Sequence, residues 1–169
     1  MKRDLWRPVY LALGSNLAQP ETQVRQAVTE LDARPELRIY LTSSLVQSAP
    51  ADGSAQPDYI NAVVAGMALC TGRQVLEICH DIERYHGRDR TAARWSARTL
   101  DIDLLALGQW TSSEPELRVP HPRLAERRFV LQPWSEIAPT FRVPGHDRVC
   151  ALLASVGGAA LPVVGSIDA

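Results

Sequence analysis

The chain has 169 residues, enough for one domain with a hydrophobic core, and its hydrophobic content of 46% is ordinary for a soluble globular protein. A net charge of −1 provides no overall field that would favour nucleic acid or a membrane surface, so any anion site must be local. The three cysteines lack metal-ligand spacing and no apolar run is long enough to span a bilayer, so we expect a cytoplasmic protein with no membrane or nucleic-acid partner.

The first third of the chain predicts a strand, a helix and a second strand. Residues 8–13 form an apolar run that ends in a Gly-Ser-Asn turn, which either only connects two elements or lets the backbone approach a ligand. Pro20 begins a helix with an apolar stripe at helical spacing, and Arg34-Pro35 ends it. Residues 37–48 alternate and predict one long strand.

A ten-residue loop, 49–58, leads into a further strand over residues 59–69. Tyr59 and Asn61 share one face of that strand, where they either hold a flat heterocycle or only pack and cap. A helix follows over residues 73–86, with His80 and Glu83 together on one face. That face is either solvated or lines a ligand site; the spacing to His86 argues against a zinc site.

The most informative stretch is the alternating segment that contains Asp101 and Asp103. Leu100, Ile102 and Leu104 are apolar and the two aspartates fall between them, which is typical of a half-buried strand. Both carboxylates then point the same way, roughly 6–7 Å apart. The alternative is the solvated face of an edge strand.

Positive charge concentrates immediately upstream of this strand. Five arginines fall within fifteen residues: Arg84, Arg88, Arg90, Arg94 and Arg98. Paired carboxylates beside guanidinium groups suit Mg²⁺ and a polyphosphate.

The remaining segments predict an extended, proline-bounded stretch, a short helix over residues 124–132, an amphipathic helix over 147–156 and a loosely attached tail over 157–169. His121 lies between two prolines and is either a brace or a phosphate contact. The order is α+β: a ferredoxin-like βαββαβ unit with an antiparallel sheet and a C-terminal helical appendage. We expect one domain, residues 1–169, with its core over about 8–156.

The motifs, taken together, resemble those of the 6-hydroxymethyl-7,8-dihydropterin pyrophosphokinases of folate biosynthesis. The resemblance spans roughly residues 8 to 156, in order and with similar spacing. It rests on Ala12-Leu13-Gly14-Ser15-Asn16-Leu17, Gln56-Pro57-Asp58-Tyr59-Ile60-Asn61-Ala62, Arg94-Trp95-x-x-Arg98-Thr99-Leu100-Asp101-Ile102-Asp103, Val119-Pro120-His121 and Pro133-Trp134-Ser135-Glu136-Ile137-Ala138-Pro139.

The resemblance implies transfer of pyrophosphate from ATP to the pterin's hydroxymethyl oxygen, with release of AMP. Asp101 and Asp103 would hold two Mg²⁺ ions and, with Arg88 and Arg98, form the catalytic group. No general base is evident, so positioning and charge neutralisation would supply the rate. The ATP site would include His80, Glu83, Arg90, Arg94, Trp95, Leu104, His121 and Arg127.

The pterin would lie between the rings of Tyr59 and Phe129, with its edge recognised by hydrogen bonds. Its site would include Ser48, Ala49, Ala51, Tyr59, Asn61 and Phe129. We expect a monomer.

The chain departs from the usual family pattern at several positions: His80, Ser96-Ala97, Glu116, Pro122 and Arg128. The departures at Ser96-Ala97 and Pro122 motivate a second hypothesis, a non-catalytic paralogue that binds pterin or nucleotide. A third is a ferredoxin-like nucleic-acid-binding module that uses the arginine segment.

Overall fold

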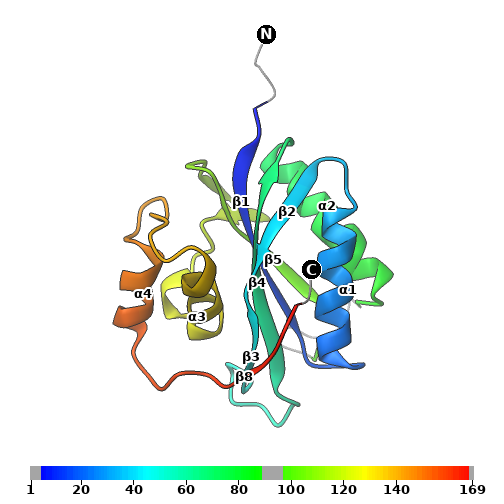
Figure 1. The fold of residues 1–169 in the computed structure, drawn as a ribbon, viewed down its shortest axis with the longest axis vertical. Helices are drawn as coiled ribbons and strands as arrows, with labels where there is room; N and C mark the ends of the chain where they lie inside the picture. Colours follow the sequence, from blue (N-terminus) through cyan, green and yellow to red (C-terminus); the bar gives the residue numbers. More distant parts are fainter. Residues whose placement is uncertain (1–4, 89–96, 168–169) are drawn as a thin grey trace.

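The structure is a computed structural model that describes residues 5–88 and 97–167. A twisted β-sheet forms the middle layer, with helices α1 and α2 on one face and α3 and α4 on the other (Figure 1). The elements are β1 (Arg7–Ser15), α1 (Pro20–Asp32), β2 (Leu37–Thr42), β3 (Ser44–Ser48), β4 (Tyr59–Ala68), α2 (Gly72–Tyr85), β5 (Asp101–Leu107), β6 (Ser112–Glu114), β7 (Leu117–Val119), the 3-10 helix η1 (Leu124–Glu126), α3 (Arg128–Ile137), α4 (Val149–Val156) and β8 (Val163–Ser166).

The strand order in the main sheet is β5-β1-β4-β3-β8, with β2 paired to the other end of β4. Every pairing is antiparallel. If β2 and β3 are taken as one interrupted strand, β1 to β5 with α1 and α2 form the predicted ferredoxin-like βαββαβ unit, and α3 and α4 form the appendage. The predicted α+β fold class is therefore confirmed.

Alternation along β1 builds two separate hydrophobic layers. Val9, Leu11 and Leu13 belong to the core beneath α1 and α2, whereas Tyr10 and Ala12 belong to the core beneath α3 and α4. This follows from the two-residue period of a strand. Because both faces of the sheet are covered, β1 and β4 are buried along most of their length.

Local sequence signals explain where the two helices after β4 begin and how they continue. The Thr71 hydroxyl accepts from the main-chain N–H of Gln74 and the Gln74 side chain accepts in return, so a capping box starts α2. Helix α3 runs through Pro133 to Ile137, beyond the predicted end at residue 132. Burial of Trp134 against Tyr10 outweighs the one backbone hydrogen bond that the proline removes.

The prediction of one long strand over residues 37–48 is wrong at its centre. Buried Ser43 separates β2 from β3. Its N–H donates to the Val63 carbonyl at 2.9 Å, but the Val63 N–H donates to the Ser43 hydroxyl rather than to a backbone carbonyl, also at 2.9 Å. The Ser43 hydroxyl thus takes the place of a backbone acceptor and interrupts the strand pairing. On either side of this break, β2 and β3 both pair with β4.

The expectation of a loosely attached tail is also wrong over residues 161–167. Strand β8 pairs with β3, and Ile167 is buried in the core beneath α1 and α2. The Gln132 side chain brackets Leu161, accepting from its N–H at 2.8 Å and donating to its carbonyl at 2.9 Å. The segment covers what would otherwise be an open sheet edge at β3.

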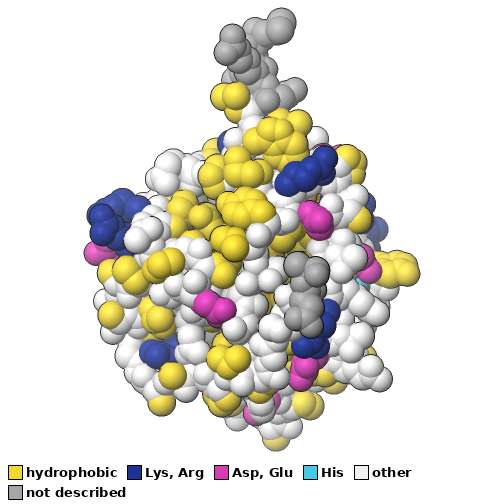
Figure 2. Space-filling view, in the orientation of Figure 1, with side chains coloured by type: hydrophobic (Ala, Val, Ile, Leu, Met, Phe, Trp, Pro, Cys, Tyr) yellow, Lys and Arg dark blue, Asp and Glu magenta, His cyan; other side chains and the backbone are white. Residues whose placement is uncertain are grey.

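Figure 2 shows hydrophobic side chains gathered on the upper part of one face, with charged side chains scattered around them. Large exposed hydrophobic residues include Trp6, just before β1, and Tyr40 and Leu41 of β2. The Arg38 guanidinium lies 5.6 Å from the centre of the Trp6 ring, which partly covers that ring. Within the described ranges, the helices are all too short or too polar to cross a membrane.

Candidate active site

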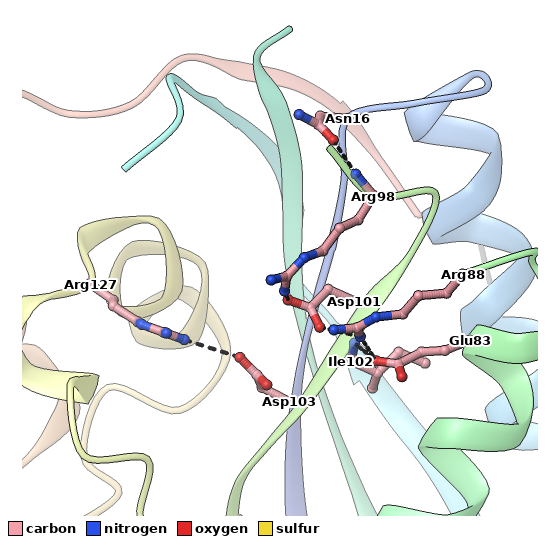
Figure 3. Close-up of polar contacts among 8 residues, drawn as sticks. All are labelled: Asn16, Glu83, Arg88, Arg98, Asp101, Ile102, Asp103 and Arg127. Carbon is pink, nitrogen blue, oxygen red and sulfur yellow. Dashed lines mark hydrogen bonds and ion pairs between the residues drawn. The ribbon is translucent and has the colours of Figure 1, made fainter. Parts of the chain in front are cut away.

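Asp101 and Asp103 of β5 lie on the same face of the sheet as α3. In the antiparallel register Asp101 is opposite Gly14 and Asp103 is opposite Ala12 on β1, so both carboxylates rise above small residues. Ile102 and Leu104 point to the other face and are buried beneath α1 and α2. The predicted shared face of the two carboxylates is therefore present (Figure 3).

Asp101 is surrounded by guanidinium groups. Arg98 contacts its Oδ2 at 2.6 Å and Arg88 contacts its Oδ1. Burial alone would raise the pKa of Asp101, but the charges and hydrogen bonds of Arg88 and Arg98 together outweigh it and hold the pKa below its ordinary value. Asp101 is therefore ionised across the physiological pH range.

Arg88 also contacts Glu83, which is 1% exposed and lies on α2. The Glu83 Oε1 accepts from the main-chain N–H of Ile102 at 2.8 Å. One buried carboxylate thus fixes the start of β5 and orients Arg88 toward Asp101 (Figure 3).

Asp103 has less neutralising charge beside it than Asp101: among the described residues its one ion-pair partner is Arg127, at 3.0 Å. Its side chain is 36% exposed and lines both cavities. Burial, followed by the negative charge of Asp101, raises the pKa of Asp103 to about 6. Two neighbouring carboxylates with such unequal neutralisation suit additional positive charge.

A first cavity of about 300 Å³ lies between the sheet and α3. We call it the ring pocket because the aromatic residues Tyr59 and Phe129 line it. Asn61 is held in its wall because its Nδ2 donates to the Ser48 hydroxyl at 2.9 Å. A Cβ at Gly14 would come within 3.3 Å of the Asn61 Oδ1, so a larger residue at this position would crowd the Asn61 side chain. The lining residues that bear on function are Ser48, Ala49, Ala51, Gln56, Tyr59, Asn61 and Phe129.

A second cavity of about 370 Å³, the outer pocket, lies between α2 and the β6–β7 hairpin. Its walls include His80, Glu83, Leu104, Glu116 and Arg118. Four residues line both cavities and so form the junction between them: Arg88, Asp101, Asp103 and His121.

His121 is held rigidly at this junction. Its Nδ1 accepts from the main-chain N–H of Arg123 at 3.1 Å, so a neutral ring carries its proton on Nε2. Burial, followed by the positive charges of Arg127 and Arg123, lowers the pKa of His121 to about 4. The ring is therefore a neutral hydrogen-bond donor near pH 7.

The structure brings together around these two cavities every described residue that the sequence singled out for the site. Arg90, Arg94 and Trp95 lie outside the described residues. Which ligand each residue contacts stays a prediction. The sequence analysis gave no role to Gln56, which lines the ring pocket, or to Asn16, whose side chain donates to Gln56. Both fall in motifs that carried the family resemblance, and that was the one signal available for them.

The carboxylate pair fits magnesium in its donor chemistry. Within residues 5–88 and 97–167 there is no group of three or more His, Cys, Asp or Glu side chains that could hold a metal ion. Asp101 and Asp103 would offer a Mg²⁺ ion two hard oxygen ligands, and phosphate oxygens and water would complete its shell, as is usual for this ion.

The fold and the site define a ferredoxin-like protein with two adjoining ligand cavities that meet at paired carboxylates and arginines. The family model for 7,8-dihydro-6-hydroxymethylpterin-pyrophosphokinase (HPPK) matches residues 10–139. The chain belongs to this family.

Curated relatives agree with the family match. A Pseudomonas aeruginosa protein named 2-amino-4-hydroxy-6-hydroxymethyldihydropteridine pyrophosphokinase is 38% identical over 147 residues, covering 87% of this chain and 90% of the relative. A Bacillus subtilis protein of the same name is 37% identical over 128 residues, covering 76% of each.

Solved structures support the fold. The Plasmodium falciparum HPPK-DHPS wild-type structure has a TM-score of 0.70 at 12% identity, covering 92% of this chain. This chain spans 45% of the length of that structure.

Proposed function

We propose that this protein transfers pyrophosphate from ATP to the hydroxymethyl group of 6-hydroxymethyl-7,8-dihydropterin, giving AMP and the pterin diphosphate for folate biosynthesis. The observation that supports this best is the junction of two cavities at Arg88, Asp101, Asp103 and His121. A reaction that joins two substrates needs two pockets whose reacting ends meet among groups that neutralise phosphate charge.

The ring pocket is the proposed pterin site. Tyr59 begins β4 and Phe129 lies in the first turn of α3, so the two rings come from opposite walls. A flat heterocycle between them would gain stacking and burial. Asn61, with Ser48, Ala49 and Ala51, would contact the polar edge of the ring.

The outer pocket is the proposed ATP site, with His80, Glu83 and Leu104 in its walls. His121, as a neutral donor, and Arg127 would contact phosphate oxygens at the junction. Arg90, Arg94 and Trp95 remain assigned to the nucleotide by family resemblance alone.

Asp101 and Asp103 are the proposed magnesium ligands, with two ions expected from the family. When bound, magnesium would withdraw charge from the phosphate oxygens and help align the attacking and leaving oxygens. The chain's own contribution is positional. Arg88 and Arg98 are held in place by Asp101 and can neutralise charge that develops on the transferred group.

The remaining assignments are also proposals: one domain over residues 1–169, a monomer, and a cytoplasmic location. The three cysteines, all within the described residues, are unpaired, which supports a reducing compartment.

The direct test is a product assay. Purified protein incubated with ATP, Mg²⁺ and the hydroxymethyl pterin should form AMP and pterin diphosphate in equal amounts, measured by chromatography. Omission of the pterin is the control and should leave ATP intact. Formation of ADP, or no product from folded protein, would contradict the proposal.

A further inference from the structure

Asn16 lies directly after β1 and is 2% exposed, yet it is not among the residues that line either cavity. Its Oδ1 accepts from the main-chain N–H of Arg98 at 2.8 Å (Figure 3), and its own main-chain N–H donates to the Arg98 carbonyl at 3.1 Å. Its Nδ2 donates to the Pro57 carbonyl at 3.1 Å and to the Gln56 Oε1 at 3.3 Å. One buried amide therefore connects three distant parts of the chain.

The segments that Asn16 joins are two walls of the proposed active site. Arg98 lines the ring pocket and pairs with Asp101 at the junction. Gln56 lines the ring pocket, and Pro57 lies two residues before Tyr59, whose ring is the proposed stacking partner. Asn16 is thus placed to set the distance between the wall of the ring pocket that carries Tyr59 and the junction of the two cavities.

The amide is the side chain that these contacts require. It offers an acceptor to Arg98 and, on the other side, two N–H donors to Gln56 and Pro57. A carboxylate of the same shape keeps the first contact but cannot donate to the other two. A leucine of similar volume would lose all of them.

We propose that Asn16 is a positioning residue that holds the ring pocket in register with the Asp101 junction, so that the pterin's hydroxymethyl group faces the phosphates. The inference rests on the proposed function and deepens it. It predicts a selective effect. Loss of the Asn16 donor bonds to Gln56 and Pro57 should impair pterin binding and turnover. The outer pocket should be unaffected, because its walls away from the junction lie on α2, β5 and the β6–β7 hairpin, none of which these two bonds touch.

The test is Asn16→Asp. Binding of the hydroxymethyl pterin should weaken by about tenfold or more, as expected for two lost hydrogen bonds at the edge of a site. Turnover at saturating pterin should also fall. Binding of a non-hydrolysable ATP analogue with Mg²⁺ should change by less than about twofold. Calorimetry on the folded full chain measures both affinities.

The matched control is Gln132→Leu. Gln132 is another amide that brackets a distant backbone segment, but its partner is Leu161, away from both cavities. Gln132→Leu should lower the melting temperature and leave pterin affinity unchanged. If Asn16→Asp does not fold, Asn16→Ser removes the same donor bonds without burying a charge.

Unchanged pterin affinity in a folded Asn16 variant would overturn the inference, as would an equal loss of pterin and nucleotide affinity. A loss confined to pterin binding and turnover would support it. Failure of the parent protein to form AMP is a different result, which would defeat the proposed function and this inference together.

Discussion

The two faces of the sheet use the same strands for different purposes. On the face beneath α1 and α2, apolar side chains continue from Val9 and Leu11 to Leu13 and, on β5, through Ile102. On the face beneath α3, the apolar layer contains Tyr10 and Ala12 but ends before the next positions along the strands. Those positions are Gly14, Asn61 and Asp101, which lie side by side in the register of β5, β1 and β4.

The difference shows how one sheet can be both stable and reactive. The continuous face supplies burial without interruption, and its close packing fixes the backbone positions of β1 and β5. The interrupted face can then place polar groups over small residues and leave a cavity. Substitutions on the two faces should therefore separate stability from chemistry.

The largest effect is expected from the carboxylates of the interrupted face. Asp101→Asn and Asp103→Asn should each lower kcat by about a thousandfold or more, because each removes a ligand of the proposed metal and changes charge at the reacting phosphates. The measurement is AMP formation at saturating substrates. Retained turnover in either variant would contradict the proposed clamp.

The two variants should differ in stability. Asp101→Asn leaves Arg88 and Arg98 without their shared anionic partner and should lower the melting temperature. The folded protein disfavours the ionised form of Asp103, since the pKa of this carboxyl is raised to about 6. The melting temperature of Asp103→Asn at pH 7 should therefore equal or exceed that of the parent. Allowing for the open part of the side chain, the gain is at most about 1–2 kcal/mol.

The next effect compares neighbouring residues that face opposite ways on β1. Leu11 is fully buried beneath α1 and α2, and Leu11→Ala should cost about 2–5 kcal/mol of unfolding free energy through lost burial and a cavity. Its kcat and KM should change by less than about twofold at a temperature where the protein is folded. Denaturant unfolding and the AMP assay are the two measurements.

Ala12→Leu is the matched variant, because Ala12 lies opposite Asp103 and lines the ring pocket. The added side chain should enter the cavity and weaken pterin binding, with a smaller change in unfolding free energy than Leu11→Ala. If both variants changed activity and stability in the same proportion, the separation of the two faces would be wrong.

The sequence predicted the different character of the two sheet faces where the hydrophobic alternation lies within one strand. The alternation of Asp101, Ile102, Asp103 and Leu104 assigns each side chain to a face from the strand period alone. The start of α2 is equally local, since Thr71 and its partner Gln74 in the capping box lie within one turn.

What could not be predicted depends on distant partners. The break at Ser43 arises from an exchange of hydrogen bonds with Val63, twenty residues away. Strand β8 forms because β3 presents a free edge. Its four residues follow Pro162 and include Gly165, so the sequence gives little sign of a strand. The role proposed for Asn16 requires contacts 40 and 82 residues along the chain.

The smallest expected effect concerns pH and His121. The ring has a folded-state pKa of about 4, below the ordinary 6.5, because burial and the arginines at positions 127 and 123 disfavour its charged form. For a depressed pKa the unfolded chain takes up the proton first. The contribution to stability is therefore complete above about pH 6.5 and is lost as the pH falls toward 4.

His121→Gln replaces the ring by an uncharged amide, which removes this pH-dependent contribution to stability and keeps an N–H donor. From pH 7 to pH 4.5 the parent should lose about 1–2 kcal/mol of unfolding free energy relative to the variant, after allowance for the partly exposed ring. Urea unfolding at several pH values measures the difference. A constant difference across that range would show that His121 keeps an ordinary pKa. In that case the residue at the junction of the two cavities would be charged below about pH 6.5 and would attract phosphate as a cation rather than only donate a hydrogen bond.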